Sequence, residues 1–158
     1  MRQGIFTLVF IFLFFSSGDY LSAQGRFQTF RSTNNLVFFE MSSHPYASML
    51  QFTLNYERST SYLEDGKINI RTGYGVYFWL LEKNHIFPIS IKYISGKRNH
   101  HIEAEAGLQI AFAHSGFKYM MTLPILNIAY RFQPFYPGLF FRIKTGITGF
   151  GLGVGFGF

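Results

Sequence analysis

Two pairs of charged residues, each spaced two apart, are the part of this sequence whose chemistry is easiest to name. Glu103 and Glu105 form one pair, and Arg142 and Lys144 form the other. Residues two apart in an extended strand face the same side, so each pair places two like charges on one surface. Paired carboxylates can act as acid and base on a ligand, as in glycoside hydrolysis. Because several cations are available as partners, the pattern favours a structural ion-pair network.

Histidine and serine residues offer two further candidate sites. His44, His85 and His114 fall in or beside three different turn regions and could converge on a metal ion. No local ligand spacing accompanies them, which favours solvated loop histidines. Ser115 beside His114 is the one adjacent pair of nucleophile and base worth naming, and no orienting third group supports it. We therefore predict no catalytic residue, no metal site, no cofactor and no enzymatic activity.

The elements that must position these residues are predicted to be strands. From Leu36 onward, apolar residues recur at every second position in stretches of about ten residues, which is typical of barrel strands rather than helices. Turn-forming residues separate the stretches. We expect eight strands, at residues 36–43, 48–59, 67–80, 86–95, 101–114, 122–133, 139–148 and 149–158.

Charged side chains fall on one face of these strands. If the more apolar face of each strand is the outside of a barrel, the opposite face includes nine charged residues: Glu40, Glu57, Arg71, Lys92, Glu103, Glu105, Arg131, Arg142 and Lys144. We call these nine residues the lumen charge network. An eight-stranded barrel is just wide enough for side chains to fill its interior. We expect the network to plug the interior and leave no open pore, with Arg58 as an outward exception at a strand end.

The sequence closes on GFGLGVGFGF, residues 149–158, in which glycine alternates with apolar residues. If the apolar residues face outward, the glycines face the interior and leave room for charged side chains from other strands. The spacing does not fit a phosphate-binding loop, because the later Gly-x-x-Gly step is missing and no helix follows. A disordered glycine-rich tail is the other alternative, and the strict alternation argues against it.

The beginning of the chain predicts export. Residues 1–23 read as a cleaved signal peptide, with Arg2 before the apolar stretch 5–15 and a cleavage site after Ala23. That stretch is too short for a membrane-spanning helix, which needs roughly 20 residues. We expect residues 24–35 to form a short lead-in and residues 36–158 to form the barrel.

Composition supports a lipid environment. Aromatic residues make up 20% of the 158 residues, with 21 Phe and 10 Tyr, and a soluble domain of this size would struggle to bury them. The chain has no cysteine, so it has no disulfides. Its formal net charge of +6 is spread along the sequence, which argues against a nucleic-acid partner.

The end of the chain resembles the C-terminal signal that the outer-membrane assembly machinery recognises in its client barrels. Gly153, Phe156 and Phe158 fit that pattern, whereas Gly151 stands where a polar residue is more usual. The body of the chain resembles a family of short outer-membrane proteins from Bacteroidetes-type bacteria. The likeness is carried by LNYERS, FPISIKYISGKRNHHIEAEAGL, NIAYRFQP, GLFFRIKTGI and the glycine-rich close. The resemblance implies an outer-membrane barrel and no established activity.

Together these features predict an all-β protein: an eight-stranded antiparallel up-and-down transmembrane β-barrel in the outer membrane of a Gram-negative bacterium. We expect a monomer with a structural, envelope or surface-interaction role, whose partners are outer-membrane lipid and, during biogenesis, the assembly machinery. Two alternatives remain open. A soluble lipocalin-like barrel would turn its apolar face inward around a small ligand, and an outer-membrane lipid-modifying enzyme would use His114 and Ser115.

An even number of strands places both termini on the periplasmic side. The connections around residues 44, 85 and 114 are then external and short, as is the TGITG turn before the last strand. His100 and His101 lie at the periplasmic end beside Lys97 and Arg98, and we expect this basic turn to meet anionic headgroups or solvent.

Overall fold

The structure is a computed structural model that describes residues 33–44, 49–79, 82–97, 99–113, 120–134 and 137–158. The predicted signal peptide and nearly all of the lead-in lie outside these residues. Within them the regular structure is entirely β-strand, and the strands close into one antiparallel barrel. The predicted all-β, eight-stranded antiparallel barrel is therefore confirmed.

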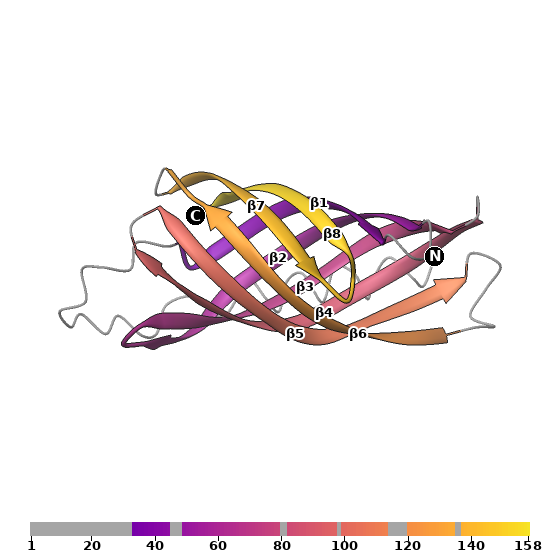
Figure 1. The fold of residues 1–158 in the computed structure, drawn as a ribbon, viewed down its shortest axis with the longest axis horizontal. Helices are drawn as coiled ribbons and strands as arrows, with labels where there is room; N and C mark the ends of the chain where they lie inside the picture. The colour runs from indigo at the N-terminus through magenta and orange to yellow at the C-terminus, as the bar shows by residue number, and fades with distance from the viewer. Residues whose placement is uncertain (1–32, 45–48, 80–81, 98, 114–119, 135–136) are drawn as a thin grey trace, which may run out of the picture.

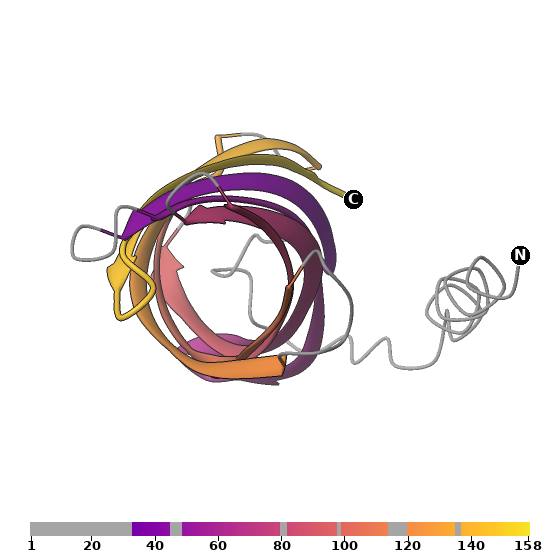
Figure 2. The ribbon, with the colours of Figure 1, turned by 90° about the vertical axis from the view of Figure 1, so that its right-hand side faces the viewer.

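Each strand pairs with the next along the chain, and the last returns to the first, as the ring in Figure 2 shows. The strands are β1 Asn35–His44, β2 Met49–Leu63, β3 Gly66–Trp79, β4 Glu82–Lys97, β5 His100–Ala113, β6 Met120–Phe132, β7 Gly138–Gly146 and β8 Phe150–Gly157. We call the end where β1 begins and β8 finishes the terminal end, on the left in Figure 1, and the opposite end the far end.

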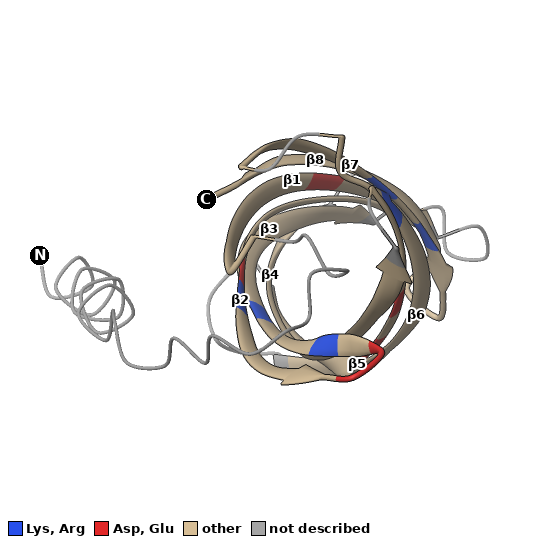
Figure 3. Cartoon of the chain, turned by 90° about the vertical axis from the view of Figure 1, so that its left-hand side faces the viewer, with Lys and Arg blue, Asp and Glu red and all other residues tan. Residues whose placement is uncertain are grey.

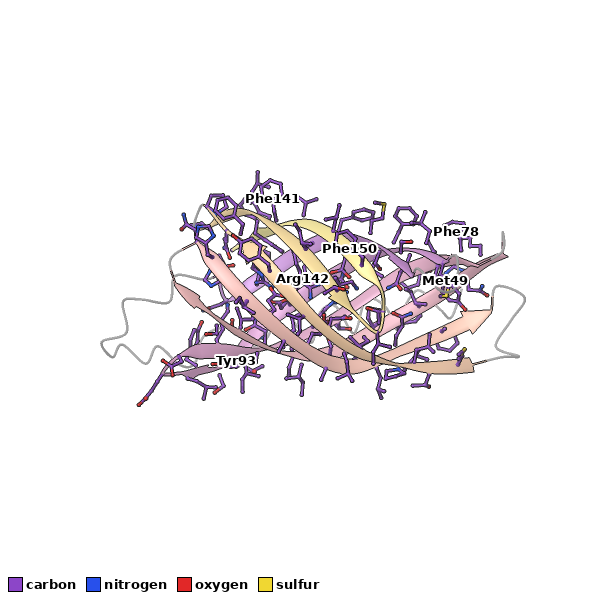
Figure 4. All side chains as sticks on the ribbon, in the orientation of Figure 1. Met49, Phe78, Tyr93, Phe141, Arg142 and Phe150 are labelled. Carbon is purple, nitrogen blue, oxygen red and sulfur yellow. The ribbon has the colours of Figure 1, made fainter. Side chains whose placement is uncertain are left out.

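Alternation in the sequence becomes two faces of one sheet, because successive side chains of a strand point to opposite sides. On β7, Phe141 lies outside the barrel and its neighbour Arg142 points into the lumen (Figure 4). The most exposed apolar side chains, Ile102 and Ile128, lie on the outer face at 63% exposure each. The lumen holds most of the buried polar residues, so the fold has a polar interior and an apolar exterior.

The hairpin of β2 and β3 is longer than predicted. Strand β2 runs on to Leu63 and is joined to β3 by the tight turn at Glu64 and Asp65, whereas the sequence predicted a loop after Ser59. A β-bulge at Thr60 shifts the register between Ser59 and Ser61. A bulge adds one residue and breaks the alternation of inward and outward side chains, which is why the sequence pattern predicted the end of the strand at Ser59. Arg58 consequently lies within the strand and not at its end.

The pair of β7 and β8 ends earlier than its neighbours at the far end. Only residues 127–132 of β6 pair with β7, and β6 continues to Met120 without a β7 partner (Figure 1). The β7–β8 turn is held by the Ile147 amide, which donates to the Leu126 carbonyl over 2.9 Å. Gly149 closes this turn with a φ of 89°, a left-handed conformation that glycine adopts without strain.

The glycines of β8 lie against β1 in the lumen. A Cβ atom added to Gly155 would overlap the Phe38 Cβ and the Val37 carbonyl oxygen, whereas one added to Gly153 would lie 3.4 Å or more from its neighbours. We expect Gly155→Ala to lower the free energy of unfolding by about 1–3 kcal/mol through overpacking, and Gly153→Ala to leave it nearly unchanged. Urea unfolding in detergent micelles, followed by circular dichroism, measures both. Equal midpoints for the two variants would contradict this packing.

Candidate functional site

The structure brings the nine residues of the lumen charge network together inside the barrel. Each of their side chains is at most 3% exposed. They come from seven of the eight strands, and Figure 3 marks charged positions around the ring as seen from the terminal end. Glycine-rich β8 is the strand that contributes none, which leaves interior space beside β1 and β7.

Arg142 is the centre of the network. Its guanidinium pairs with three carboxylates: Nε lies 2.7 Å from Glu103 Oε2, Nη2 lies 2.8 Å from Glu105 Oε2, and Nη1 pairs with Glu40. A planar guanidinium presents its donors in a fixed fork, so one arginine can hold several carboxylates in a single geometry. Arg142 thereby joins β7 to β1 and β5 across the interior.

Arg71 and Lys144 complete the half of the network nearer the far end. Arg71 binds Glu105 over 2.7 Å and Glu40 over 3.1 Å, and the Lys144 ammonium lies 2.7 Å from Glu40. Glu40 therefore has three cationic partners. A carboxylate buried in this way is stabilised by its partners against the cost of leaving water.

Glu57 and Glu103 organise the half nearer the terminal end. Glu57 pairs with Lys92 over 2.6 Å and with Arg131 over 2.8 Å. Glu103 pairs with Arg131, with Lys92 over 3.6 Å and with Arg142, so it connects the two halves. Four carboxylates and five cations thus form one continuous structure.

Neutral side chains satisfy further oxygen and nitrogen atoms of the network. Ser90 Oγ donates to Glu105 over 2.6 Å, Asn69 Nδ2 donates to Glu57 over 2.5 Å, and Arg71 Nε donates to Asn55 over 2.9 Å. Buried charges need such partners because the interior offers no bulk water. Since each carboxylate has at least two cationic partners, the arrangement favours a structural role over acid–base catalysis.

Phe38 lies among the cations of the network. Its ring centroid is 4.8 Å from Lys92 Nζ and 5.3 Å from Arg71 Cζ, and it packs edge-on against Phe140. We expect Phe38→Leu to lower the free energy of unfolding by about 2 kcal/mol, because desolvated cation–π contacts are lost. Phe39→Leu is the matched control, since Phe39 is exposed on the outer face. Similar urea midpoints for the two variants would contradict this role for Phe38.

Two other lumen residues were missed or misplaced by the sequence analysis. Lys67 is buried, and its ammonium donates to the Thr33 carbonyl over 2.7 Å and to Ser59 over 2.9 Å. Its spacing of four from Arg71 already put it on the inward face. His101 is fully buried, so the prediction that it faces headgroups or solvent is wrong. It shares a face with Glu103, two residues later.

The histidine and serine candidates are only partly described. His85 Nδ1 lies 2.6 Å from the Tyr74 hydroxyl, and the two rings stack on the outer face. The side chains of His44, His114 and Ser115 lie outside the described part of the structure. Among the described residues, no group of three or more His, Cys, Asp or Glu side chains could hold a metal ion.

The residues of the predicted assembly signal lie on β8 and just after it. Phe156 and Phe158 are outward and 49% exposed, and Gly153 faces the lumen beside Arg142. Phe158 exchanges two backbone hydrogen bonds with Asn35, of 2.9 and 3.1 Å. The aromatic side chains of this segment are therefore presented on the outside, next to β1.

Comparison with known proteins adds no further information on function. No protein-family model matches this chain, and no curated protein has a significantly similar sequence. The described part of the chain contains no helix with the length and apolar character needed to cross a membrane.

Proposed function

We propose that this protein is an integral outer-membrane β-barrel with a plugged lumen, acting as a monomeric structural, envelope or surface-interaction protein without enzymatic activity. The eight strands of the barrel cross the lipid. Because the barrel is closed, every strand has a neighbour on both sides, and no sheet edge runs the length of the membrane. The signal peptide delivers the chain to the periplasm, and the outward aromatic residues at its end engage the assembly machinery.

The observation that carries this proposal is the inverted distribution of side chains. Ten charged side chains, the nine of the lumen charge network and Lys67, are buried in the lumen, whereas large apolar side chains on all eight strands are exposed. Monomeric soluble proteins rarely expose contiguous apolar patches larger than a few hundred Å². Lipid solvates such a surface, and an apolar outer band is the hallmark of outer-membrane barrels.

Aromatic residues near both ends of the outer face support the same setting. Tyr93 and Tyr130 are exposed towards the terminal end, and Phe78 and Phe87 are exposed towards the far end. Aromatic side chains form girdles at the two interfaces of a membrane barrel. The lipocalin-like alternative needs an apolar interior, and the buried charges argue against it.

Gel mobility of the membrane-fraction protein tests the proposal. A closed barrel resists detergent until it is heated, so we expect unheated and boiled samples to migrate differently and the protein to sediment with outer membranes. A soluble protein with the same mobility in both samples would refute the membrane assignment and make a ligand screen the next step.

A further inference from the structure

The lumen contains a cavity above the charge network, towards the far end. It measures about 300 Å³ and is lined mainly by apolar residues, including Met49, Tyr77, Met121 and Leu123. Ser42 and Thr148 lie among the lining residues, on the side nearer the network. This volume is at the lower end of the roughly 300–1,000 Å³ of small-molecule sites. The cavity therefore suits a narrow ligand rather than a bulky one.

The cavity lies inside the barrel and also opens to the outside through the barrel wall. Its lining includes Pro124 and Ile147, which face outward, together with inward-facing Gln51 and Gln109. The reason is the early end of β7 and β8, which leaves residues 120–125 of β6 without a β7 neighbour. Inward-facing and outward-facing residues therefore line one cavity beside this interruption of the wall.

The interruption lies within the apolar outer band. Leu108 and Phe112, which face outward on β5, pair with Pro124 and Met120 of β6 beside the opening. A second, shallow groove on the outer face, of about 980 Å³, includes Ala106 and Leu126 and also reaches Ile147; its lining is mainly apolar and includes the inward-facing residues Glu105 and Asn127. An apolar path thus runs along the outside of the barrel and meets the cavity at Ile147.

Pro124 removes one backbone donor from the open strand edge. The Leu126 carbonyl points towards β7, because it accepts the Ile147 amide, and residues two apart in a strand direct their backbone groups to the same side. Pro124 therefore occupies a position whose amide would point into the gap, and proline has no N–H group. An unpaired backbone donor in hydrocarbon would cost several kcal/mol.

We propose that this cavity binds one hydrocarbon chain of a bilayer lipid, which enters sideways from the leaflet at the far end of the barrel. The inference depends on the proposed membrane location. The apolar lining, the narrow volume and the opening towards the outer apolar band all match an acyl chain. Ser42 Oγ is buried in the lining without a hydrogen-bond partner among the described residues, and none of the described residues that line the cavity is charged. The two lining glutamines, Gln51 and Gln109, are hydrogen-bonded to each other over 3.2 Å, and the described lining offers a charged ligand no counter-ion.

The test is photocrosslinking of the full protein in vesicles containing a phospholipid with a diazirine near the end of one acyl chain. Adducts are mapped to residues by mass spectrometry. We expect adducts on outward residues such as Ile128, and also on lumen-facing Ser42 or Gln109, which a chain reaches only through the opening. Leu123→Trp fills the cavity and should lose the lumen adducts while keeping the outward ones. Leu139→Trp, the same change on the outer face at the terminal end and away from the opening, should keep both.

The possible results separate this inference from the membrane assignment. Outward adducts without lumen adducts in the unaltered protein would overturn the acyl-chain site and leave the membrane barrel intact. Absence of outward adducts would overturn the membrane location and the site with it. A parallel sample receives a free fatty acid that carries the diazirine. Lumen adducts from the free acid alone would overturn the assignment to a bilayer lipid.

Discussion

Replacing Glu103 with glutamine is expected to lower the free energy of unfolding by about 3–5 kcal/mol, the range for removing one partner from a buried ion pair. Glu103 is fully buried and touches Arg131, Lys92 and Arg142. Glutamine keeps the shape and removes the charge, so these cations lose their shared counter-ion. The network already has one more cation than carboxylates, and the substitution increases that excess.

Lys144→Met is the matched control for this prediction. Lys144 is also buried, and its one ion pair among the described residues is with Glu40, which retains Arg71 and Arg142. Its removal leaves four cations and four carboxylates, so we expect a cost well below that of Glu103→Gln. The double variant Glu103→Gln, Arg131→Met should recover part of the loss, because it removes one of the cations that Glu103 balanced.

Urea unfolding in detergent micelles, followed by circular dichroism, measures all three variants on one scale. If Lys144→Met destabilised the barrel as much as Glu103→Gln, the excess of positive charge would not govern the stability of the lumen. If the double variant were no more stable than Glu103→Gln alone, Arg131 and Glu103 would not be energetically coupled.

Introducing arginine at Leu108 is expected to have the second large effect. Leu108 is 54% exposed on the outer face, in the middle of β5. An arginine at the midplane of a lipid-facing surface costs about 2–4 kcal/mol, and this cost falls to about 0–1 kcal/mol near the interfaces. Leu108→Arg should therefore reduce the fraction of protein that folds into lipid vesicles.

Leu139→Arg is the control at a different depth. Leu139 is 51% exposed, close to Leu108 in exposure, and lies one residue after the start of β7 at the terminal end. In water the two changes would have similar effects, whereas in lipid only Leu108→Arg should be costly. Unchanged folding of Leu108→Arg into vesicles would refute the lipid-facing assignment of this part of β5.

Much of the fold could be predicted because the side-chain period of a strand survives in the sequence. The alternation around Glu103 and Glu105, or around Arg142 and Lys144, determines which residues share a face whatever the partner strands are. The glycines of β8 carry the same information by the absence of side chains. Predicted and observed strand limits differ by a few residues, with the largest differences at the end of β2, beside the β-bulge of Thr60, and at the start of β4.

Other features could not be predicted because alternation does not determine register. That Glu103 joins Arg131 to Arg142 depends on how β5, β6 and β7 are aligned, and the connection between β6 and β7 is too long to set this alignment. The early end of the β7–β8 pair beside Pro124 has the same origin. The cavity exists there because β6 extends further towards the far end than β7 and β8 do, and the sequence of one strand does not determine how far its neighbours extend.

The pairing of β1 with β8 affects the rate at which the barrel closes and the tendency of its edge strands to pair with another copy. These two strands are neighbours in the barrel and the farthest apart along the chain, from Leu36 opposite Gly157 to Ser43 opposite Phe150. Closing the longest loop costs the most chain entropy, so this contact is expected to be the last to form. Until it forms, both strands are free edges that another chain can join. Slow closure at high concentration would therefore favour exchange of strands between copies over a closed ring.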